Sequence, residues 1–246
     1  MAQLIVALDV ETAEEAERVI DSLYELDLIF KVGFESLFGY PGRIVSYLES
    51  RDARYFVDAK LHDIPRTVDA AVRRLVRPGV HIIDVHALGG SEMMRSAVEA
   101  ARERADELGM TAPYVFAVTI LTSIAQEGLQ EIGMRGGVEE NVARLAALAR
   151  DAGCAGVVSS AQEVRDIKRR LGANFLTLTP GIRPDGSAHG DQKRVVTPAQ
   201  AVVAGADYLV VGRPIAQAAD PPAAAAAILA EMRSASASVS AGTERR

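Results

Sequence analysis

The sequence predicts an α/β protein with a single (βα)8 barrel, or TIM barrel. Eight short apolar segments alternate with segments of helical periodicity from one end of the chain to the other. These apolar segments are too continuously hydrophobic to have one face in water, which is typical of parallel strands covered by helices. The length of 246 residues is that of an ordinary eight-stranded barrel. A closed barrel therefore fits better than an open doubly wound sheet.

Strands are expected where apolar and β-branched residues cluster between turn signals. The expected strands are residues 4–8, 28–32, the beginning of 55–68, 81–85, 113–118, 156–158, 174–178 and 208–211.

Helices follow from local start and stop signals. Thr12 and Glu15 form a capping box, and Pro78-Gly79 ends a helix. The expected helices are 12–25, one ending near 49 after a break at 39–42, 67–77, 91–108, a short turn before 138–151, then 161–171 and 214–233. Residues 1–233 are thus expected to form one catalytic barrel domain. The small, polar residues 234–246 are expected to be a disordered tail.

Composition excludes several classes of function. The net charge of −6 provides no basic surface, so no nucleic-acid partner is expected. No apolar run approaches the ~18 residues of a membrane span, and the N-terminus has no basic signal-peptide region. We therefore expect no membrane association and a cytoplasmic location. The single cysteine, Cys154, excludes an intrachain disulfide and reads as a small buried hydrophobic residue.

The most informative stretch is residues 55–68, Y-F-V-D-A-K-L-H-D-I-P-R-T-V. Asp58 and Lys60 stand two residues apart on a strand, so their side chains point to the same side. Asp63 follows shortly before a proline that suits the start of a helix. An ordinary salt bridge at a strand end would explain Asp58 and Lys60 alone. Two carboxylates around one ammonium repel each other unless a ligand or second cation offsets the charge, which favours a functional site with Lys60 as proton donor.

Further polar residues fall at or just beyond the ends of the expected strands. Active sites of such barrels are built at the carboxyl ends of the strands, where this sequence has Asp9, Asp58, Lys60, His86, Thr122, Ser159 and Arg213. Lys31 lies inside the second strand, and a lysine there is rarely buried without a partner. One face of the barrel is therefore expected to collect the chemistry.

Two features near the last strands predict a phosphate site. The loop 179–192 exceeds the usual α/β connection of about 2 to 6 residues and is expected to be a lid, although a mere insertion would have the same length. Residues 211–214, V-G-R-P, place a glycine and a guanidinium at the start of a helix, where barrels commonly bind phosphate. His81, His86 and His189 are too scattered for a metal cluster. No nucleotide-binding glycine loop is present either, so neither metal nor cofactor is expected.

Seven motifs together resemble those of the orotidine 5′-phosphate decarboxylase family, over nearly the whole chain. They are I-V-A-L-D at 5–9, F-K-V-G at 30–33, D-A-K-L-H-D-I-P at 58–65, T-I-L-T-S at 119–123, T-P-G-I-R-P at 179–184, G-D-Q-K-R at 190–194 and V-G-R-P-I at 211–215. The D-x-K-x-x-D core is shared with a wider set of sugar-phosphate barrels. The H-D-I-P continuation and the G-I-R-P loop are more specific.

The resemblance implies a carboxy-lyase that converts orotidine 5′-monophosphate to UMP and CO2, the last step of de novo pyrimidine nucleotide synthesis. It implies an alternating network of Lys31, Asp58, Lys60 and Asp63. It also implies a homodimer, in which Asp63 and Thr67 serve the site of the other subunit.

Substrate contacts are implied by the same resemblance. Asp9 would contact the ribose and Thr122 the pyrimidine edge. The residues implied to hold the phosphate and order the lid are Arg183, Gln192, Gly212 and Arg213. The family has leucine or phenylalanine at the position of Ala59 and often asparagine at that of Arg66, and Arg66 could alter the dimer edge.

Two alternatives remain open at this level. One is a magnesium-dependent relative acting on 3-keto-gulonate 6-phosphate or a hexulose phosphate. Such relatives have a glutamate where this chain has Lys31, and a cation there would repel Mg²⁺. The other is a non-catalytic barrel that binds a phosphate ligand, favoured only if the charged network were incomplete. All four of its charged residues are present.

Overall fold

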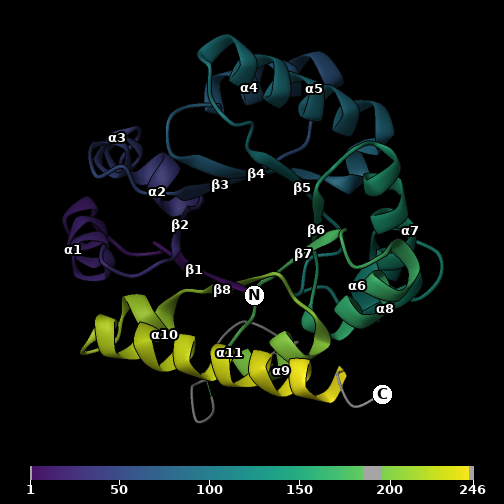
Figure 1. The fold of residues 1–246 in the computed structure, drawn as a ribbon. Helices are drawn as coiled ribbons and strands as arrows, with labels where there is room; N and C mark the ends of the chain where they lie inside the picture. The colour runs from purple at the N-terminus through teal and green to yellow at the C-terminus, as the bar shows by residue number, and fades with distance from the viewer. Residues whose placement is uncertain (1, 185–195, 244–246) are drawn as a thin grey trace.

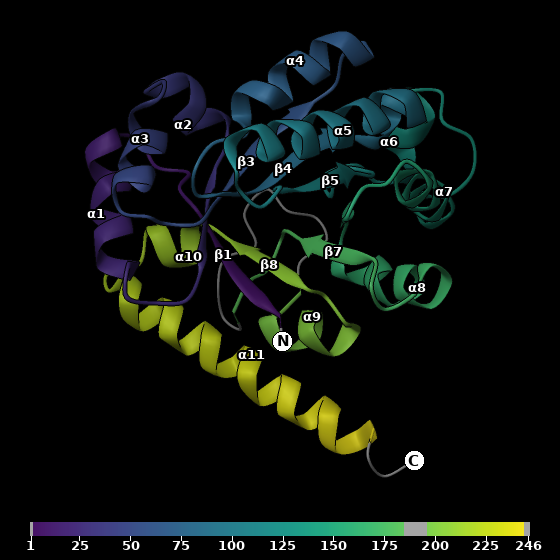
Figure 2. The same ribbon diagram turned by 45° about the horizontal axis from the view of Figure 1, so that its top comes forward.

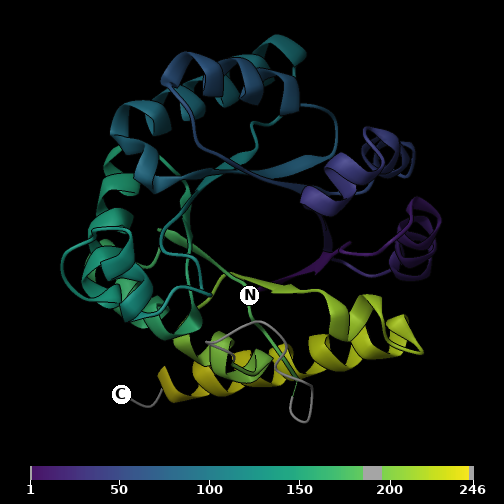
Figure 3. The same ribbon diagram turned by 180° about the vertical axis from the view of Figure 1, so that it is seen from behind.

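The computed structural model describes residues 2–184 and 196–243. Within them, eight parallel strands close into a barrel in the order β1 to β8, with β8 paired to β1. Helices surround the barrel when it is seen from the front (Figure 1) and from behind (Figure 3). The prediction of a single (βα)8 barrel is confirmed. Because all strands run the same way, their carboxyl ends meet at one face.

The strands lie close to their expected positions. Their bounds are β1 Gln3–Ala7, β2 Ile29–Val32, β3 Tyr55–Leu61, β4 Val80–His86, β5 Tyr114–Val118, β6 Gly156–Val158, β7 Leu176–Thr179 and β8 Tyr208–Val211. β6 and β8 have the expected bounds, and the others differ only at their ends.

The helices include several that the sequence pattern did not reveal. Their bounds are α1 Ala13–Leu23, α2 Phe34–Gly39, α3 Arg43–Ser50, α4 Pro65–Leu75, η1 Ala87–Gly89, α5 Gly90–Leu108, α6 Gln126–Glu131, α7 Val138–Asp151, α8 Ala161–Leu171, α9 Pro198–Ala204, α10 Arg213–Ala216 and α11 Pro221–Thr243. α7 and α8 have the expected bounds. α2 and α9 were not expected, although α9 begins with a complete capping box between Thr197 and Gln200.

The end of the chain differs from the expectation. α11 continues to Thr243, and Ala235 within it is buried. A helix that has already formed extends without a new nucleus, and alanine is the strongest helix former, so the alternating serines and alanines after Arg233 continue it. The expected disordered tail is therefore wrong for residues 234–243. α11 runs past α9 on the outside of the barrel (Figure 2), and no described helix is long and apolar enough to cross a membrane.

A separate hydrophobic core fills the inside of the barrel. Its buried residues come from most of the strands: Ile5, Ala7, Ile29, Phe56, Ile82, Phe116, Leu178, Tyr208 and Val210. Gly156 on β6 allows this packing, because a Cβ there would lie 2.2 Å from the carbonyl oxygen of Leu176 and 2.7 Å from the ring of Phe116. The larger core lies between the strands and the surrounding helices.

Candidate active site

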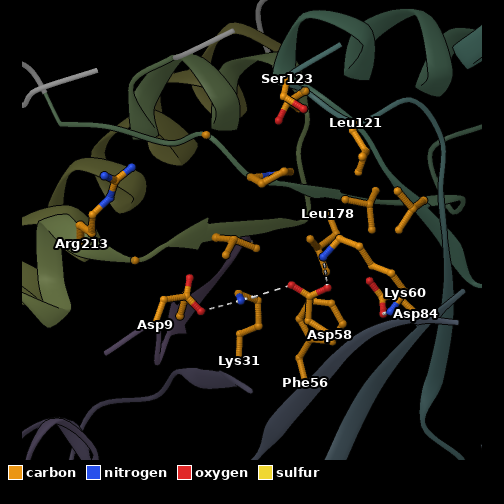
Figure 4. Close-up of a pocket in the computed structure, with 18 of the residues that line it drawn as sticks. Asp9, Lys31, Phe56, Asp58, Lys60, Asp84, Leu121, Ser123, Leu178 and Arg213 are labelled. Atoms are coloured by element: carbon orange, nitrogen blue, oxygen red, sulfur yellow. Dashed lines mark hydrogen bonds and ion pairs between the residues drawn. The ribbon is translucent and has the colours of Figure 1, made fainter. Parts of the chain in front are cut away.

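A cavity of about 740 Å³ opens at the carboxyl ends of the strands (Figure 4). Its volume is within the range of small-molecule sites. Residues on or after the strands around the whole barrel line the cavity. They include Asp9, Lys31, Asp58, Lys60, Asp84, Thr122, Ser159, Arg183, Gly212 and Arg213. Of the seven strand-end residues expected to gather at one face, six line this cavity and His86 does not.

Four charged side chains form a continuous row across the cavity floor. Lys31 Nζ lies 3.0 Å from Asp9 Oδ1 and 3.2 Å from Asp58 Oδ2. The other oxygen of Asp58 contacts Lys60 Nζ. The row therefore alternates in sign across β1, β2 and β3, and the Lys60 ammonium is turned toward Asp58 (Figure 4).

Burial and neighbouring charge act in opposite directions on this row. Burial disfavours the charge of Lys31, but the carboxylates of Asp58 and Asp9 outweigh it and raise the pKa of Lys31. Burial would likewise raise the pKa of Asp58, but the ammonium groups of Lys31 and Lys60 hold that pKa below its ordinary value. Both groups are thus kept in their charged forms despite their burial.

The main chain at Lys60 is unusual. Its φ of 43° lies in the left-handed region, which non-glycine residues rarely adopt. The pairing of β3 with β4 shifts register between Val57 and Leu61, so Lys60 lies in an irregular part of the strand. Its N–H donates a 2.7 Å hydrogen bond to Oδ1 of the buried Asp84 on β4. The Lys60 side chain also lies over the ring of Phe34, with Nζ 5.6 Å from the ring centroid.

Gly33 is required by the position of Lys31. A Cβ at residue 33 would lie 2.7 Å from Lys31 Nζ and 3.3 Å from Asp9 Oδ1. The glycine between β2 and α2 therefore leaves room for the ammonium group between its two carboxylates.

Three of the expected phosphate residues, Arg183, Gly212 and Arg213, line the same cavity. Gly212 precedes α10, and its carbonyl accepts hydrogen bonds from the N–H groups of Ile215 and Ala216. Arg213 lies on the opposite side of the cavity from Lys60 (Figure 4). Arg183 is held by a 3.0 Å hydrogen bond from its N–H to the carbonyl of Val196. The Arg213 guanidinium thus lies on the side of the cavity away from Lys60.

Asp63 and Thr67 do not join the row in one chain. Asp63 is exposed between β3 and α4, where its carboxylate accepts a 2.6 Å hydrogen bond from the N–H of Ile64. Thr67, in the first part of α4, is exposed as well. Neither residue lines the cavity, and within the described chain Lys60 Nζ contacts Asp58 and the Phe34 ring instead.

Comparisons with known proteins show the family of the chain. A family model described as orotidine 5′-phosphate decarboxylase / HUMPS family matches residues 2–228. The chain belongs to the orotidine 5′-phosphate decarboxylase family. It is therefore a carboxy-lyase by family.

Several relatives in this family resemble the chain over nearly its whole length. An orotidine 5′-phosphate decarboxylase of Moorella thermoacetica is 49% identical over 94% of this chain and 92% of its own. One from Nitratidesulfovibrio vulgaris is also 49% identical, over 94% and 98% of the two chains. The crystal structure of orotidine 5′-phosphate decarboxylase from Lactobacillus acidophilus has a TM-score of 0.84 at 36% identity, covering 94% of this chain and 99% of that one.

The residues expected from the family motifs fall into three groups in the structure. Asp9, Lys31, Asp58, Lys60, Thr122, Arg183, Gly212 and Arg213 line one cavity. Asp63 and Thr67 lie outside it. Gln192 and most of the expected lid lie outside the described residues.

Sequence reasoning missed Asp84 and the role of Gly33. The signal for Asp84 was an acidic residue inside the apolar run I-I-D-V of the fourth strand. Ser159 was noted only as lying at a strand end. In the structure it is buried in the cavity wall, and its hydroxyl has no hydrogen-bond partner among the described residues. Such a group is available to a ligand.

Proposed function

We propose that the protein decarboxylates orotidine 5′-monophosphate to UMP and CO2, the last step of de novo pyrimidine nucleotide synthesis. The observation that carries the proposal is the alternating row Asp9, Lys31, Asp58 and Lys60 on the cavity floor. The names of the full-length relatives support the same substrate and reaction.

The row matches the electrostatic demand of the reaction. Loss of CO2 from C6 of the pyrimidine leaves a carbanion with no adjacent carbonyl to delocalise its charge. Stabilisation must then come from a cation fixed beside that carbon. Lys60 meets this demand, because its ion pair with Asp58 fixes its ammonium group in the cavity. After CO2 leaves, Lys60 donates a proton to C6.

The remaining residues are proposed to hold the substrate. Arg213, Gly212 and Arg183 bind the phosphate with Gln192 of the lid, far from the bond that breaks. Binding energy from the phosphate then helps close the lid and assemble the site. Asp9 contacts the ribose, and Thr122 contacts the pyrimidine edge.

A homodimer completes the network in this proposal. Asp63 of a second copy joins Lys60, and Thr67 of that copy reaches the substrate. The exposure of Asp63 and Thr67, which follow β3, supports this arrangement. So does the neighbouring Ile64, an apolar residue with 63% of its surface exposed.

The magnesium-dependent alternative is disfavoured by Lys31. Its ammonium lies between the carboxylates of Asp9 and Asp58, which a divalent cation would need as ligands. Turnover of orotidine 5′-monophosphate that is unaffected by a chelator would separate the two reactions.

The deciding experiment follows the absorbance of orotidine 5′-monophosphate with the purified protein. We expect turnover by the wild type and none by Lys60→Ala, whereas binding of UMP survives because the phosphate contacts are intact. Near-normal turnover by a correctly folded Lys60→Ala protein would refute the role of Lys60. Absence of turnover by the wild type would refute the proposed reaction.

A further inference from the structure

Asp84 lies near both groups that position the ammonium of Lys60, which are the Lys60 main chain and the Asp58 carboxylate. It lies on β4, is 1% exposed and lines the cavity. Its Oδ1 accepts the N–H of Lys60 at 2.7 Å, where the Lys60 main chain has its left-handed conformation. Its carboxyl group also lies near that of Asp58, and the negative charge of Asp58 acts on it. Asp84 therefore binds the main chain of Lys60 and lies near the carboxylate that fixes the Lys60 ammonium.

Two buried carboxyl groups close to each other repel unless one of them carries a proton. Asp58 contacts the ammonium groups of Lys31 and Lys60, which favour its ionised form. Asp84 makes no ion pair among the described residues, and its neighbour across the strand pair on β5 is the apolar Phe116. The proton therefore belongs to Asp84. Burial, which is the larger cause, and the negative charge of Asp58 both raise the pKa of Asp84 well above its usual range.

We propose that Asp84 is a protonated positioning residue for the decarboxylation site. Its O–H donates to the Asp58 carboxylate, and its other oxygen accepts the N–H of Lys60. These two bonds fix the orientation of Asp58 between its two lysines and hold the irregular main chain that aims Lys60 into the cavity. The inference rests on the proposed function, since Lys60 is the proton donor only in that reaction.

The charged and titratable groups near Asp84 agree with a neutral carboxyl group at this position. Asp58 and Lys60 face it from β3, and His86 follows on β4 itself, where burial lowers the pKa of the imidazole. An ionised Asp84 would place a second negative charge against Asp58. It would thereby pull the Lys60 ammonium away from the reacting carbon.

The test compares two substitutions at residue 84. Asp84→Asn keeps a donor and an acceptor in the same places without a titrating proton, whereas Asp84→Leu has a similar size and neither group. We expect kcat of Asp84→Asn to stay within about fivefold of wild type, the effect of one ordinary hydrogen bond. We expect kcat of Asp84→Leu to fall about 100-fold, as for a misplaced catalytic group, with little change in KM.

A substitution on the same strand separates positioning from stability. Ile82→Val removes one methyl group from the inner core of the barrel, so it lowers thermal stability but leaves kcat unchanged. Near-wild-type kcat in Asp84→Leu, or an equal fall in both residue 84 variants, would overturn the proposal.

A spectroscopic measurement tests the proton without relying on activity or on the folding of Asp84→Leu. Infrared difference spectra of wild type against Asp84→Asn at neutral pH are expected to contain the band of a protonated carboxyl group. Absence of that band overturns the inference even if decarboxylation is confirmed. Its presence in a protein that does not decarboxylate orotidine 5′-monophosphate would refute the proposed function and leave the protonation of Asp84 established.

Discussion

Gly33 and Lys31 are fitted to each other. A Cβ on residue 33 would lie 2.7 Å from Lys31 Nζ, closer than any non-bonded carbon and nitrogen can remain. The same ammonium lies 3.0 Å from Asp9 and 3.2 Å from Asp58, so moving it aside lengthens one of these ion pairs. The geometry of the charged row thus depends on the absence of a side chain at residue 33.

Gly33→Ala is therefore expected to impair catalysis more than stability. The alanine displaces the flexible end of Lys31, which costs little in folding free energy, but it shifts the charge next to Asp58. We expect kcat to fall about 10- to 100-fold, as for small displacements of catalytic groups. The measurement is steady-state kinetics together with a thermal melt.

Gly39→Ala is the matched control for this substitution. A Cβ at residue 39, at the end of α2, would meet no heavy atom within 4 Å. We expect wild-type kinetics. A loss of activity in Gly39→Ala equal to that in Gly33→Ala would show that the effect of residue 33 does not pass through Lys31.

Arg213→Ala tests the phosphate end of the cavity. Removing a charge-assisted contact to a remote phosphate is expected to lower kcat/KM about 100-fold, with a smaller loss in kcat. Arg169→Ala on α8, where the side chain is 73% exposed and paired with Asp166, is the control and should match wild type. An unchanged kcat/KM in Arg213→Ala would count against the phosphate assignment.

A mixture of two inactive variants tests whether Asp63 acts across subunits. Lys60→Ala and Asp63→Asn each remove one member of every site, but a mixed dimer contains one site with both wild-type residues. Random exchange should therefore restore about one quarter of the wild-type rate per subunit. If Asp63 served its own subunit, the mixture would stay inactive. The same mixing experiment with Thr67→Ala in place of Asp63→Asn tests the interface independently. Its expected effect is smaller.

The protonation of Asp84 also predicts how stability depends on pH. Its pKa is raised in the folded protein, so its contribution to stability is complete below the unfolded pKa and is lost as pH rises through the folded one. The wild-type free energy of unfolding, relative to Asp84→Asn, should fall by up to about 1.4 kcal/mol per pH unit above pH ~4. Denaturant titrations at a series of pH values provide the measurement. Parallel pH profiles for the two proteins would contradict the raised pKa.

Local signals predicted much of the fold. The bounds of β6, α7, α8 and β8 match because apolar runs, caps and turn residues act over a few neighbouring positions. The same local signals were present but unused at α9, where Thr197, Pro198 and Gln200 form its capping box. The helix beyond Arg233 was missed because its small, alternating residues lack an amphipathic period.

The sequence by itself determined the barrel, the family and most of the charged residues that line the cavity, since these depend on periodicity and on motifs read along the chain. Only the tertiary structure decided that Lys31 lies between Asp9 and Asp58. The parallel pairing of β1, β2 and β3 brings these three residues together. The tertiary structure alone revealed the left-handed main chain of Lys60 and the buried Asp84 that accepts its N–H. The physical reason is that hydrogen bonds and charge interactions depend on distances in space, which residue spacing along the chain does not fix.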